Sequence, residues 1–560
     1  METDLLQPSS PVVKIEGGYR PTSNGIPFAG HAAPEHVGNF SHSREGVPDD
    51  SLVAWRSFAA ASQQTIDRYL EVYMEFIYPL FPLFHGPTMW DRVRRQHYLV
   101  DRGFFASIMA ACALAAARTR DGATGEKYQS DQGASQSSET FFAAAQDALP
   151  KDLSKATGLG YLRAYALLVL SSIQHGRLQA MHQYMGHYMT LSAMQQFHDE
   201  NKWPVNLTVV EKEERRRLFW CVYTLDIYMS AVFGTISRSQ ETHSNVQYPS
   251  EVDDEDISSD SISSSSDDLH WLRGWNFTTD LYRILEHTLK RLRRNKQNLT
   301  DDRTSIVRLL IADNVPDLQV METMLDLYYA LPPRFKDAQS PATGERSHDL
   351  IRFQAANVQA TLQLVRIVLF ESSNWQDLDR KCEVAEQVLT TFSNIPAHYL
   401  RAISTPLVYH LGGIGKILAS VVQDVLTEEK YQRVRALLGS LADLLEDLES
   451  GLQPAAGASK EIRAHIDKID HFMEAQRQML ASFAQAPHSL ENIPEMSMNN
   501  GTQNGVDHGH LHLPTNSLGM RTPLDEFQLP GDLTAGWPFP FALTPGDDQQ
   551  LSGFHDETRA

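Results

Sequence analysis

The chain has 560 residues, of which 42% are hydrophobic, so it can bury one large core or two ordinary ones. Its formal net charge of −21 at pH 7 excludes an overall electrostatic attraction for nucleic acid, which depends on Lys and Arg. The three cysteines, each more than 100 residues from the next, exclude a local disulfide framework, and no apolar run predicts a membrane-spanning helix.

The first 50 residues carry six prolines and seven acidic against three basic residues, and they have no apolar signal segment. This composition predicts a disordered segment over residues 1–50. Residues 251–268 carry eight acidic residues and no basic one, and residues 487–560 carry ten acidic and two basic residues. These three segments hold nearly all of the negative charge, so the remainder is expected to be close to neutral.

Helical patterning begins after residue 51 and leads into the turn Tyr-Pro-Leu-Phe-Pro-Leu-Phe-His at 78–85. No second ligand lies near His85, so we interpret it as a structural histidine at a helix end. Residues 104–117 form an Ala-rich buried helix, and residues 121–138 are predicted to be a surface loop. Two further helices are predicted at 161–174 and 178–197.

The longest helix signal lies between Thr208 and Gly234. Thr208 and Glu211 form a capping box, which predicts the start of the helix. From Leu218 onward the helix is apolar nearly all round, which predicts a central core helix that stops at Gly234. Asp226 is the one carboxylate in this apolar part and needs a partner, either Arg163 or one of Arg215 to Arg217, or a Tyr hydroxyl or backbone donor.

Residues 235–256 are predicted to be an extended loop, and the acidic, Ser-rich stretch at about 251–268 a disordered insertion inside the domain. A helix resumes at Trp271. It carries the densest basic cluster of the chain, which is either a nuclear-localisation signal or a solvated helix face. This cluster consists of Lys290, Arg291, Arg293, Arg294 and Lys296.

Further helices are predicted at 318–330, 350–370, 384–392, 407–426, 431–452 and 462–483. Because residues 51–485 show hardly any alternating strand pattern, we predict an all-α fold: one large helical domain with disordered N-terminal and C-terminal tails. The tail, residues 486–560, places aromatic residues among acidic ones, which is typical of a disordered activation segment that binds coactivators; the alternative is a solvated tail. The candidate activation residues are Phe527, Trp537, Phe539 and Phe541.

As an ordered set, the residues of the central helix resemble the signature of the fungal-specific transcription factor domain, the middle homology region of fungal zinc-cluster regulators. The set consists of Arg215, Arg216, Arg217, Phe219, Trp220, Tyr223, Asp226, Ser230 and Gly234, followed by Pro249, Asp253 and Asp254. The turn at 78–85, the paired helices before residue 208 and Leu-Pro-Pro at 331–333 are also similar to the family. The resemblance implies a helical regulatory domain over residues 51–485.

The resemblance has one departure, because a zinc cluster needs six closely spaced cysteines and residues 1–111 contain none. We therefore expect a nuclear transcriptional regulator that reaches DNA through a partner, with direct DNA binding left open. Its tail would contact the transcription machinery or a coactivator. Homodimers, or heterodimers with a zinc-cluster regulator, are the expected assemblies. The alternative is an inhibitory or scaffold protein that pairs with such a regulator.

Enzyme chemistry is weakly supported by the sequence, so we expect no catalytic residue, cofactor or metal site. Gly412 to Lys416 lacks the spacing of a phosphate loop, and His508, His510 and His512 have no Cys or carboxylate support. A terpene cyclase is the remaining enzyme alternative, because Asp253 to Asp256 approach an Asp-rich magnesium motif. Ile257 stands where its last carboxylate is required.

Overall fold

The computed structural model describes residues 61–124, 134–263, 270–298, 316–340, 343–372, 378–403, 406–408, 411–412, 427–450 and 457–484. These residues all belong to one compact unit. They form α-, 3-10 and π-helices and no strand, apart from one isolated bridge between Ile257 and Ile262. The predicted all-α class is confirmed. None of the described helices has the length and apolar character needed to span a membrane.

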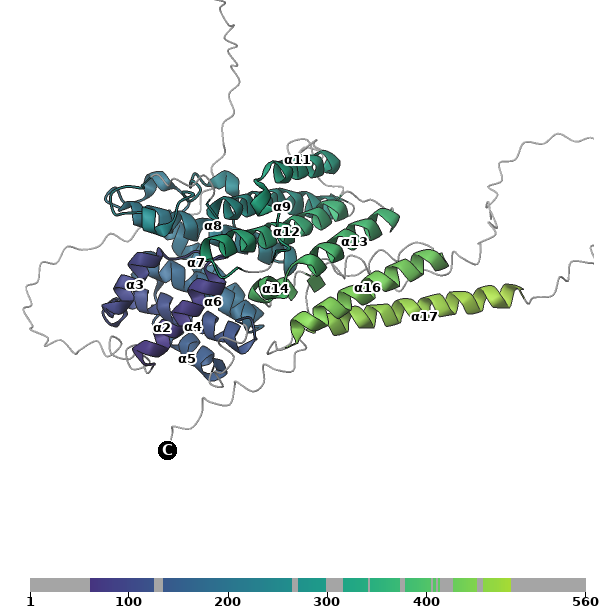
Figure 1. Ribbon diagram of the computed structural model, residues 1–560, viewed down its shortest axis with the longest axis horizontal. Helices are drawn as coiled ribbons and strands as arrows, with labels where there is room; N and C mark the ends of the chain where they lie inside the picture. Colours follow the sequence, from purple (N-terminus) through teal and green to yellow (C-terminus); the bar gives the residue numbers. More distant parts are fainter. Residues whose placement is uncertain are drawn as a thin grey trace, which may run out of the picture. The chain divides into compact units, whose positions relative to one another are not determined.

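The first half of the domain is built from consecutive helices that pack on one another (Figure 1). These are α2 (Gln63–Val72), the π-helix η1 (Tyr73–Ile77), α3 (Gly86–Arg94), α4 (Arg102–Arg120), α5 (Ala134–Asp147), α6 (Leu159–Gln174), α7 (Leu178–Met194) and α8 (Val209–Val232). Short 3-10 turns separate several of them, among them η2 (His97–Leu99), η4 (Leu153–Lys155) and η5 (Glu200–Lys202).

Helix α4 is the most buried element of this half, as its Ala-rich sequence predicts. Every residue from Gly103 to Thr119 is buried, and the helix packs against α2, α5 and α6. Its start is fixed by Asp101, whose side chain accepts a hydrogen bond from the backbone N–H of Phe104 at 2.9 Å. Small alanine side chains allow the neighbouring helices to approach α4 closely.

Helix α5 corrects the predicted loop at 121–138, because the chain is helical from Ala134 onward. Ser138 is fully buried there, and its hydroxyl donates to the carbonyl oxygen of Ala113 in α4 at 2.9 Å. Phe141 and Phe142 are buried in the same core. Packing against α4 thus overrides the polar, loop-like composition of the segment.

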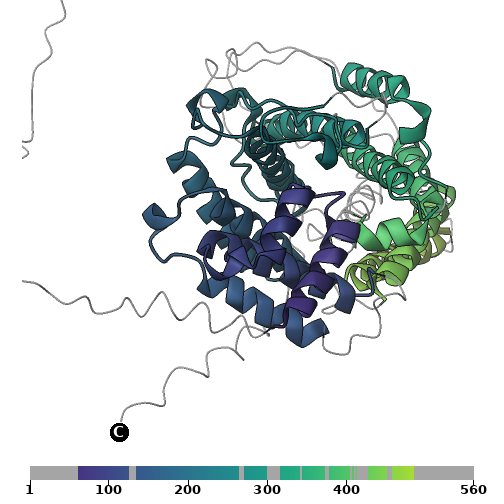
Figure 2. The same cartoon turned by 60° about the vertical axis from the view of Figure 1, so that its left-hand side comes forward.

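The second half continues with long helices, of which α9 and α12 pack on each other, as do α16 and α17 (Figure 2). Between α8 and α9 lie the 3-10 turns η6 (Glu241–His243) and η7 (Asp254–Asp256). The remaining elements are α9 (Leu272–Asn298), α11 (Asp317–Ala330), η8 (Pro333–Phe335), α12 (Arg346–Ser372), α13 (Leu378–Asn394), α14 (Ala397–Ile403), α16 (Glu428–Glu449) and α17 (Ala458–Ala484). Most of the segment predicted as a helix at 407–426 lies outside the described residues.

Helix α8 has the start, burial and stop that its sequence predicts. The capping box between Thr208 and Glu211 is formed, with the Glu211 carboxylate accepting from the Thr208 backbone N–H at 2.9 Å. Every residue from Leu225 to Val232 is buried. The chain leaves the helix through Gly234, whose φ of +67° lies in the left-handed region that favours glycine.

The contact between α4 and α6 generates a testable prediction. A Cβ atom added to Gly160 would lie 2.6 Å from the backbone carbon of Gly103, so the two helix backbones touch at this point. We expect Gly160→Ala to destabilise the protein by about 1–3 kcal/mol, because neither backbone can yield cheaply. Thermal or urea unfolding measures this cost.

Gly186→Ala in α7 is the matched control. Apart from its chain neighbours and the backbone of its own helix, no atom lies within 4 Å of a Cβ added there, so this change should stabilise the protein by about 0.5–1 kcal/mol through helix propensity alone. Equal effects of the two substitutions would contradict the close contact between α4 and α6.

Candidate functional site: the ionic core around the signature helix

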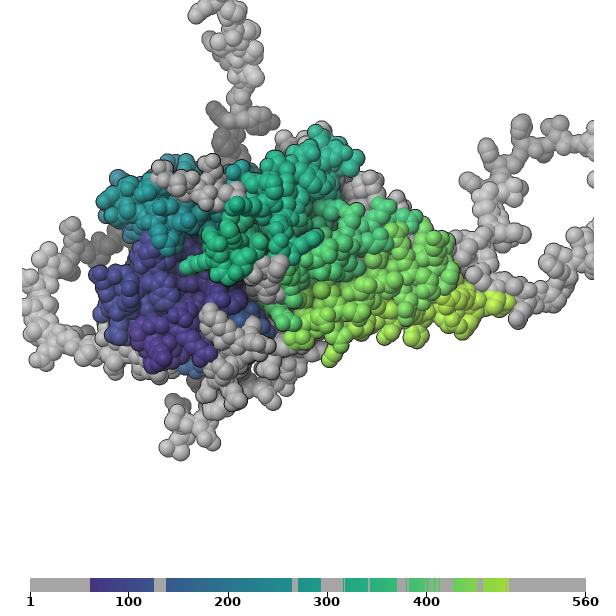
Figure 3. All heavy atoms as spheres, in the orientation of Figure 1, coloured from purple at the N-terminus to yellow at the C-terminus, as the bar shows by residue number. Residues whose placement is uncertain are grey.

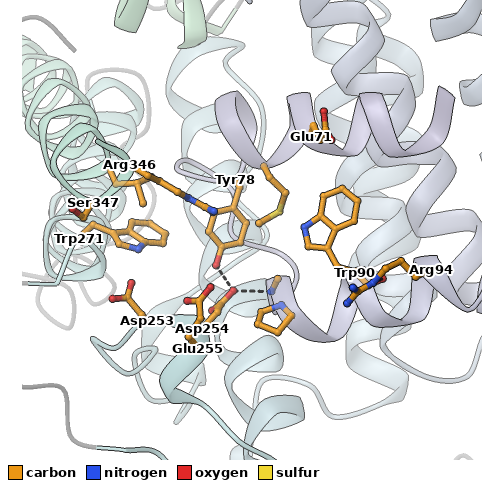
Figure 4. Close-up of a pocket in the computed structure, with 14 residues that line it drawn as sticks. Glu71, Tyr78, Trp90, Arg94, Asp253, Asp254, Glu255, Trp271, Arg346 and Ser347 are labelled. Carbon is orange, nitrogen blue, oxygen red and sulfur yellow. Dashed lines mark hydrogen bonds between the residues drawn. The ribbon is translucent and has the colours of Figure 1, made fainter. Parts of the chain in front are cut away.

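Arg217 of α8 is a fully buried cation. Its side chain is 1% exposed, and its Nη1 lies 2.6 Å from Oδ1 of Asp254 in η7. The hydroxyl of Tyr78 and the backbone N–H of Gly86 each donate to Oδ2 of Asp254 at 2.7 Å (Figure 4). Asp254 therefore joins α8 to both ends of the 78–86 turn.

The pKa of Asp254 reflects these contacts. Burial by itself would raise it, but the Arg217 guanidinium and the hydrogen bonds from Gly86 and Tyr78 hold the pKa of the carboxyl below its ordinary value. Asp254 is consequently ionised at neutral pH and compensates the buried charge of Arg217.

This arrangement corrects the predicted disorder of residues 251–268 for the part that the structure describes, residues 251–263. There the chain forms η7, and Ile257 is buried and bridges to Ile262. The acidic composition suggested a solvated segment, but a buried Arg217 requires a carboxylate, and Asp254 supplies it. Residues 264–269 lie outside the described residues.

Arg163 of α6 and Glu214 of α8 hold the turn at 81–85. Arg163 Nη2 lies 3.0 Å from Oε2 of Glu214, and its Nε donates to the Leu83 carbonyl oxygen at 2.6 Å. Glu214 Oε1 accepts from the backbone N–H of His85 at 2.8 Å. His85 caps α3, and its Nε2 lies 2.6 Å from the carbonyl oxygen of Asp254. The predicted structural role of His85 at a helix end is confirmed.

Arg216 and Trp220 hold the loop that follows α8. Arg216 pairs with Glu200 at 2.6 Å and with Glu213 at 2.9 Å. The Trp220 indole N–H donates to the carbonyl oxygen of Gln247 at 3.0 Å, and its ring lies 4.8 Å from that of Tyr248. The loop of residues 245–250 is thereby fixed along α8.

The arginine hypothesis for Asp226 is wrong. Arg163 and Arg217 are committed to other carboxylates, and Asp226 Oδ2 instead accepts from the backbone N–H groups of Arg238 and Ser239, both at 2.6 Å. The side chain of Arg238 approaches Oδ1 at 3.7 Å. Burial raises the pKa of Asp226, although these N–H groups and the Arg238 charge oppose the rise. The alternative of a backbone donor is the one that the structure supports.

The other signature residues complete the packing around α8. The Tyr223 hydroxyl donates to Glu286 of α9 at 2.6 Å, and the Ser230 hydroxyl donates to the carbonyl oxygen of Thr235 at 3.1 Å. Phe219 is partly buried, with its ring 5.2 Å from that of Trp220. Arg215 lies over the rings of Phe197 and Trp203, with its guanidinium carbon 5.5 and 5.7 Å from their centroids.

The remaining candidate residues divide between α9 and the tail. Lys290, Arg291 and Arg293 lie on α9, where Lys290 pairs with Glu286 and Arg293 donates to the carbonyl oxygen of Ser230 at 2.8 Å. The side chains of Arg294 and Lys296, and the candidate activation residues, lie outside the described residues. The candidate activation residues are Phe527, Trp537, Phe539 and Phe541.

The chemistry of this core is structural. Its arginines and carboxylates neutralise one another in pairs that span several helices. Among the described residues, no group of three or more His, Cys, Asp or Glu side chains is placed to hold a metal ion. In the Asp-rich segment that suggested a magnesium motif, Asp254 forms an ion pair with Arg217.

Sequence reasoning missed the pairing of Arg217 with Asp254 and that of Arg163 with Glu214. A signal was present for the first pair, because Asp254 belongs to the ordered signature that includes Arg217. Nothing in the local pattern links Arg163 to Glu214, since the two residues lie on different helices.

Asp254→Asn should destabilise the protein by about 3–5 kcal/mol at pH 7, because it leaves the buried Arg217 uncompensated. The pKa of Asp254 in the folded state lies below the ordinary value of 3.8. The ionised carboxylate therefore contributes fully to the free energy of unfolding at pH values well above 3.8, and this contribution is lost as the pH falls through the folded-state pKa. The difference in the free energy of unfolding between wild type and variant, measured by urea unfolding, should therefore narrow toward pH 3.

The control is Glu255→Gln, an exposed neighbour, which should change stability by about 0.5 kcal/mol or less. A gap independent of pH would contradict an ionised Asp254.

The part of the chain that forms this core matches a known protein family. Residues 70–330 match the fungal specific transcription factor domain. The chain is 26% identical over 226 residues to pyrimidine pathway regulatory protein 1 of Saccharomyces cerevisiae, covering 40% of this chain and 22% of that protein. It is 22% identical over 228 residues to transcriptional activator protein acu-15 of Neurospora crassa, covering 39% of this chain and 23% of that protein.

A third relative, activator of stress genes 1 of Saccharomyces cerevisiae, is 24% identical over 153 residues, covering 27% of this chain and 15% of that protein. The chain thus spans less than a quarter of the length of each of these relatives. The matched domain belongs to transcription factors and not to enzymes, which rejects the terpene cyclase alternative. Residues 70–330 are therefore a fungal specific transcription factor domain, as the ordered set of residues in the central helix predicted.

Proposed function

We propose that this chain is a nuclear transcriptional regulator that acts through its helical domain and its acidic C-terminal tail and reaches DNA through a partner protein. The match of residues 70–330 to the fungal specific transcription factor domain carries the regulatory role. A transcription factor family implies function in the nucleus. The basic cluster on α9 is a candidate import signal.

The three cysteines support indirect DNA contact. Cys112 lies in α4, Cys221 in α8 and Cys382 in α13, and all three are buried. Burial raises the pKa of each thiol, which disfavours the thiolate form that binds zinc. Because a zinc cluster needs six cysteines close together, these three cannot form one.

The proposed partner is a zinc-cluster regulator that pairs with the helical domain and supplies the DNA contacts. The second candidate function uses the same pairing with the opposite result, since a chain without its own DNA contacts would inhibit the regulator that it binds. The composition of residues 486–560, which mixes aromatic and acidic residues, favours activation over inhibition.

DNA binding tests the proposed dependence on a partner. We expect the purified chain to bind duplex DNA weakly and without strong sequence preference at physiological salt, because its excess of acidic residues repels phosphates. Chromatin sites occupied by the tagged protein should depend on a co-purifying zinc-cluster protein. Nanomolar, sequence-specific binding by the isolated chain would overturn the proposal.

Residues 522–560, fused to an unrelated DNA-binding domain, test activation by the tail. Replacement of Trp537, Phe539 and Phe541 by Ala should abolish reporter activity, because aromatic side chains would make the contacts with a coactivator. Asp547→Asn with Asp548→Asn is the control. It should reduce activity only in part, since each exposed charge contributes about 1 kcal/mol or less in salt. A silent wild-type fusion would favour the inhibitor.

A further inference from the structure

A groove lies between α2, η1 and α3 on one side and η7 and the start of α12 on the other. Figure 3 shows these purple, teal and green surfaces meeting on one face of the domain. Its main pocket has a volume of about 660 Å³, and a second pocket of about 490 Å³ adjoins it. The two share five lining residues: Glu71, Met74, Trp90, Arg346 and Leu350. This volume suits a small organic ligand.

Aromatic rings form the walls of the main pocket. Trp90 and Trp271 stand on opposite sides of Tyr78 (Figure 4). The rings of Tyr78 and Trp271 lie 5.7 Å apart, and both residues are buried. Trp90 is only partly buried, so its indole remains accessible from the groove. Indole faces attract cations through their ring quadrupole.

The groove is also acidic. The two pockets are lined by six carboxylates, those of Glu71, Glu75, Asp253, Asp254, Glu255 and Asp349. Only two lining residues are cationic, Arg94 and Arg346. Arg217 neutralises Asp254. The carboxylates of Glu71, Asp253, Glu255 and Asp349 then outnumber the two guanidinium groups of the lining.

His270 does not remove this excess at neutral pH. It lies 2.8 Å from Asp253, and burial lowers the pKa of its imidazole, so the ring is largely neutral at pH 7. Asp253, with its side chain 60% exposed, and Glu255, which is also exposed, therefore line the main pocket without a compensating charge on His270.

We propose that this groove is a binding site for a small organic cation, whose ammonium or guanidinium group lies against the accessible indole of Trp90, with Glu255 as the nearby opposite charge of the same pocket. An aromatic face and carboxylates act together in such a site, because the indole replaces part of the water shell of the cation and the carboxylates supply opposite charge. The inference is independent of the proposed function, and its failure would leave the regulatory role untouched.

The effect of Arg346→Gln on affinity distinguishes a cationic ligand from an anionic or zwitterionic one. Arg346 is exposed and lines both pockets. An anionic or zwitterionic ligand would use its guanidinium, so Arg346→Gln would weaken binding. A cation is repelled by it, so the same change should strengthen binding.

Isothermal titration of the full chain with choline and with spermidine at low salt tests the proposal. We expect saturable binding of at least one of these cations. The control is 3,3-dimethylbutan-1-ol, which has nearly the shape of choline but no charge, and it should not bind. A Lys/Arg-rich peptide that bound while both small cations did not would overturn the assignment to a small molecule.

Three variants then locate the site. Trp90→Leu should weaken cation binding about two- to tenfold, as the loss of one cation–π contact predicts. Glu255→Gln should weaken it about two- to fivefold, and Arg346→Gln should strengthen it by a similar factor. Unchanged melting temperatures would show that the fold is intact, and Glu255 and Arg346 are exposed, which favours this result.

Binding of the neutral alcohol as tight as that of choline would overturn the proposal, because the site would then be merely apolar. Weaker binding in Arg346→Gln would also overturn it and would assign the groove to an anion or zwitterion. Cation affinity unchanged in both Trp90→Leu and Glu255→Gln would place any binding elsewhere.

Discussion

The buried charge of Arg217 is the constraint on which the rest of the domain depends. A guanidinium removed from water must be neutralised nearby, and here the carboxylate comes from Asp254, 37 residues further along the chain. That single requirement brings the chain after α8 back to the start of the domain, where Tyr78 and Gly86 donate to the same carboxylate. Segments from the start and from the interior of the matched region thus share one ionic centre.

Local signals were predictable from the sequence, and pairings between distant residues were not. The start of α8 follows from Thr208 and Glu211, three residues apart, and its stop from Gly234. The partner of Asp226 could not be read in this way, because two backbone N–H groups, at Arg238 and Ser239, satisfy it. Every residue type except proline has a backbone N–H group, so no sequence pattern shows which of these groups will donate to Asp226.

The polar composition of two segments led to wrong predictions of their structure, for the same physical reason. Ser138 in α5 and Asp254 in η7 both lie in polar segments that are typical of solvated chain. Ser138 is nevertheless buried, the side chain of Asp254 is only 9% exposed, and both side chains have specific hydrogen-bond partners. Average polarity describes a segment, whereas burial is decided residue by residue. The groove beside η7 was not predicted either. Trp90 and Trp271 are 181 residues apart in the sequence, and only the fold brings them to the same pocket.

The π-helical turn η1 has a consequence for how this domain can change during evolution. Its hydrogen bond from the Tyr78 N–H to the Tyr73 carbonyl oxygen spans five residues, one more than an α-helix uses. Removing one residue there would restore α-helical spacing and rotate everything after it by about 100°. Tyr78 would then turn away from Asp254. The number of residues in this turn, as well as their identity, therefore determines whether the Tyr78 hydroxyl reaches Asp254.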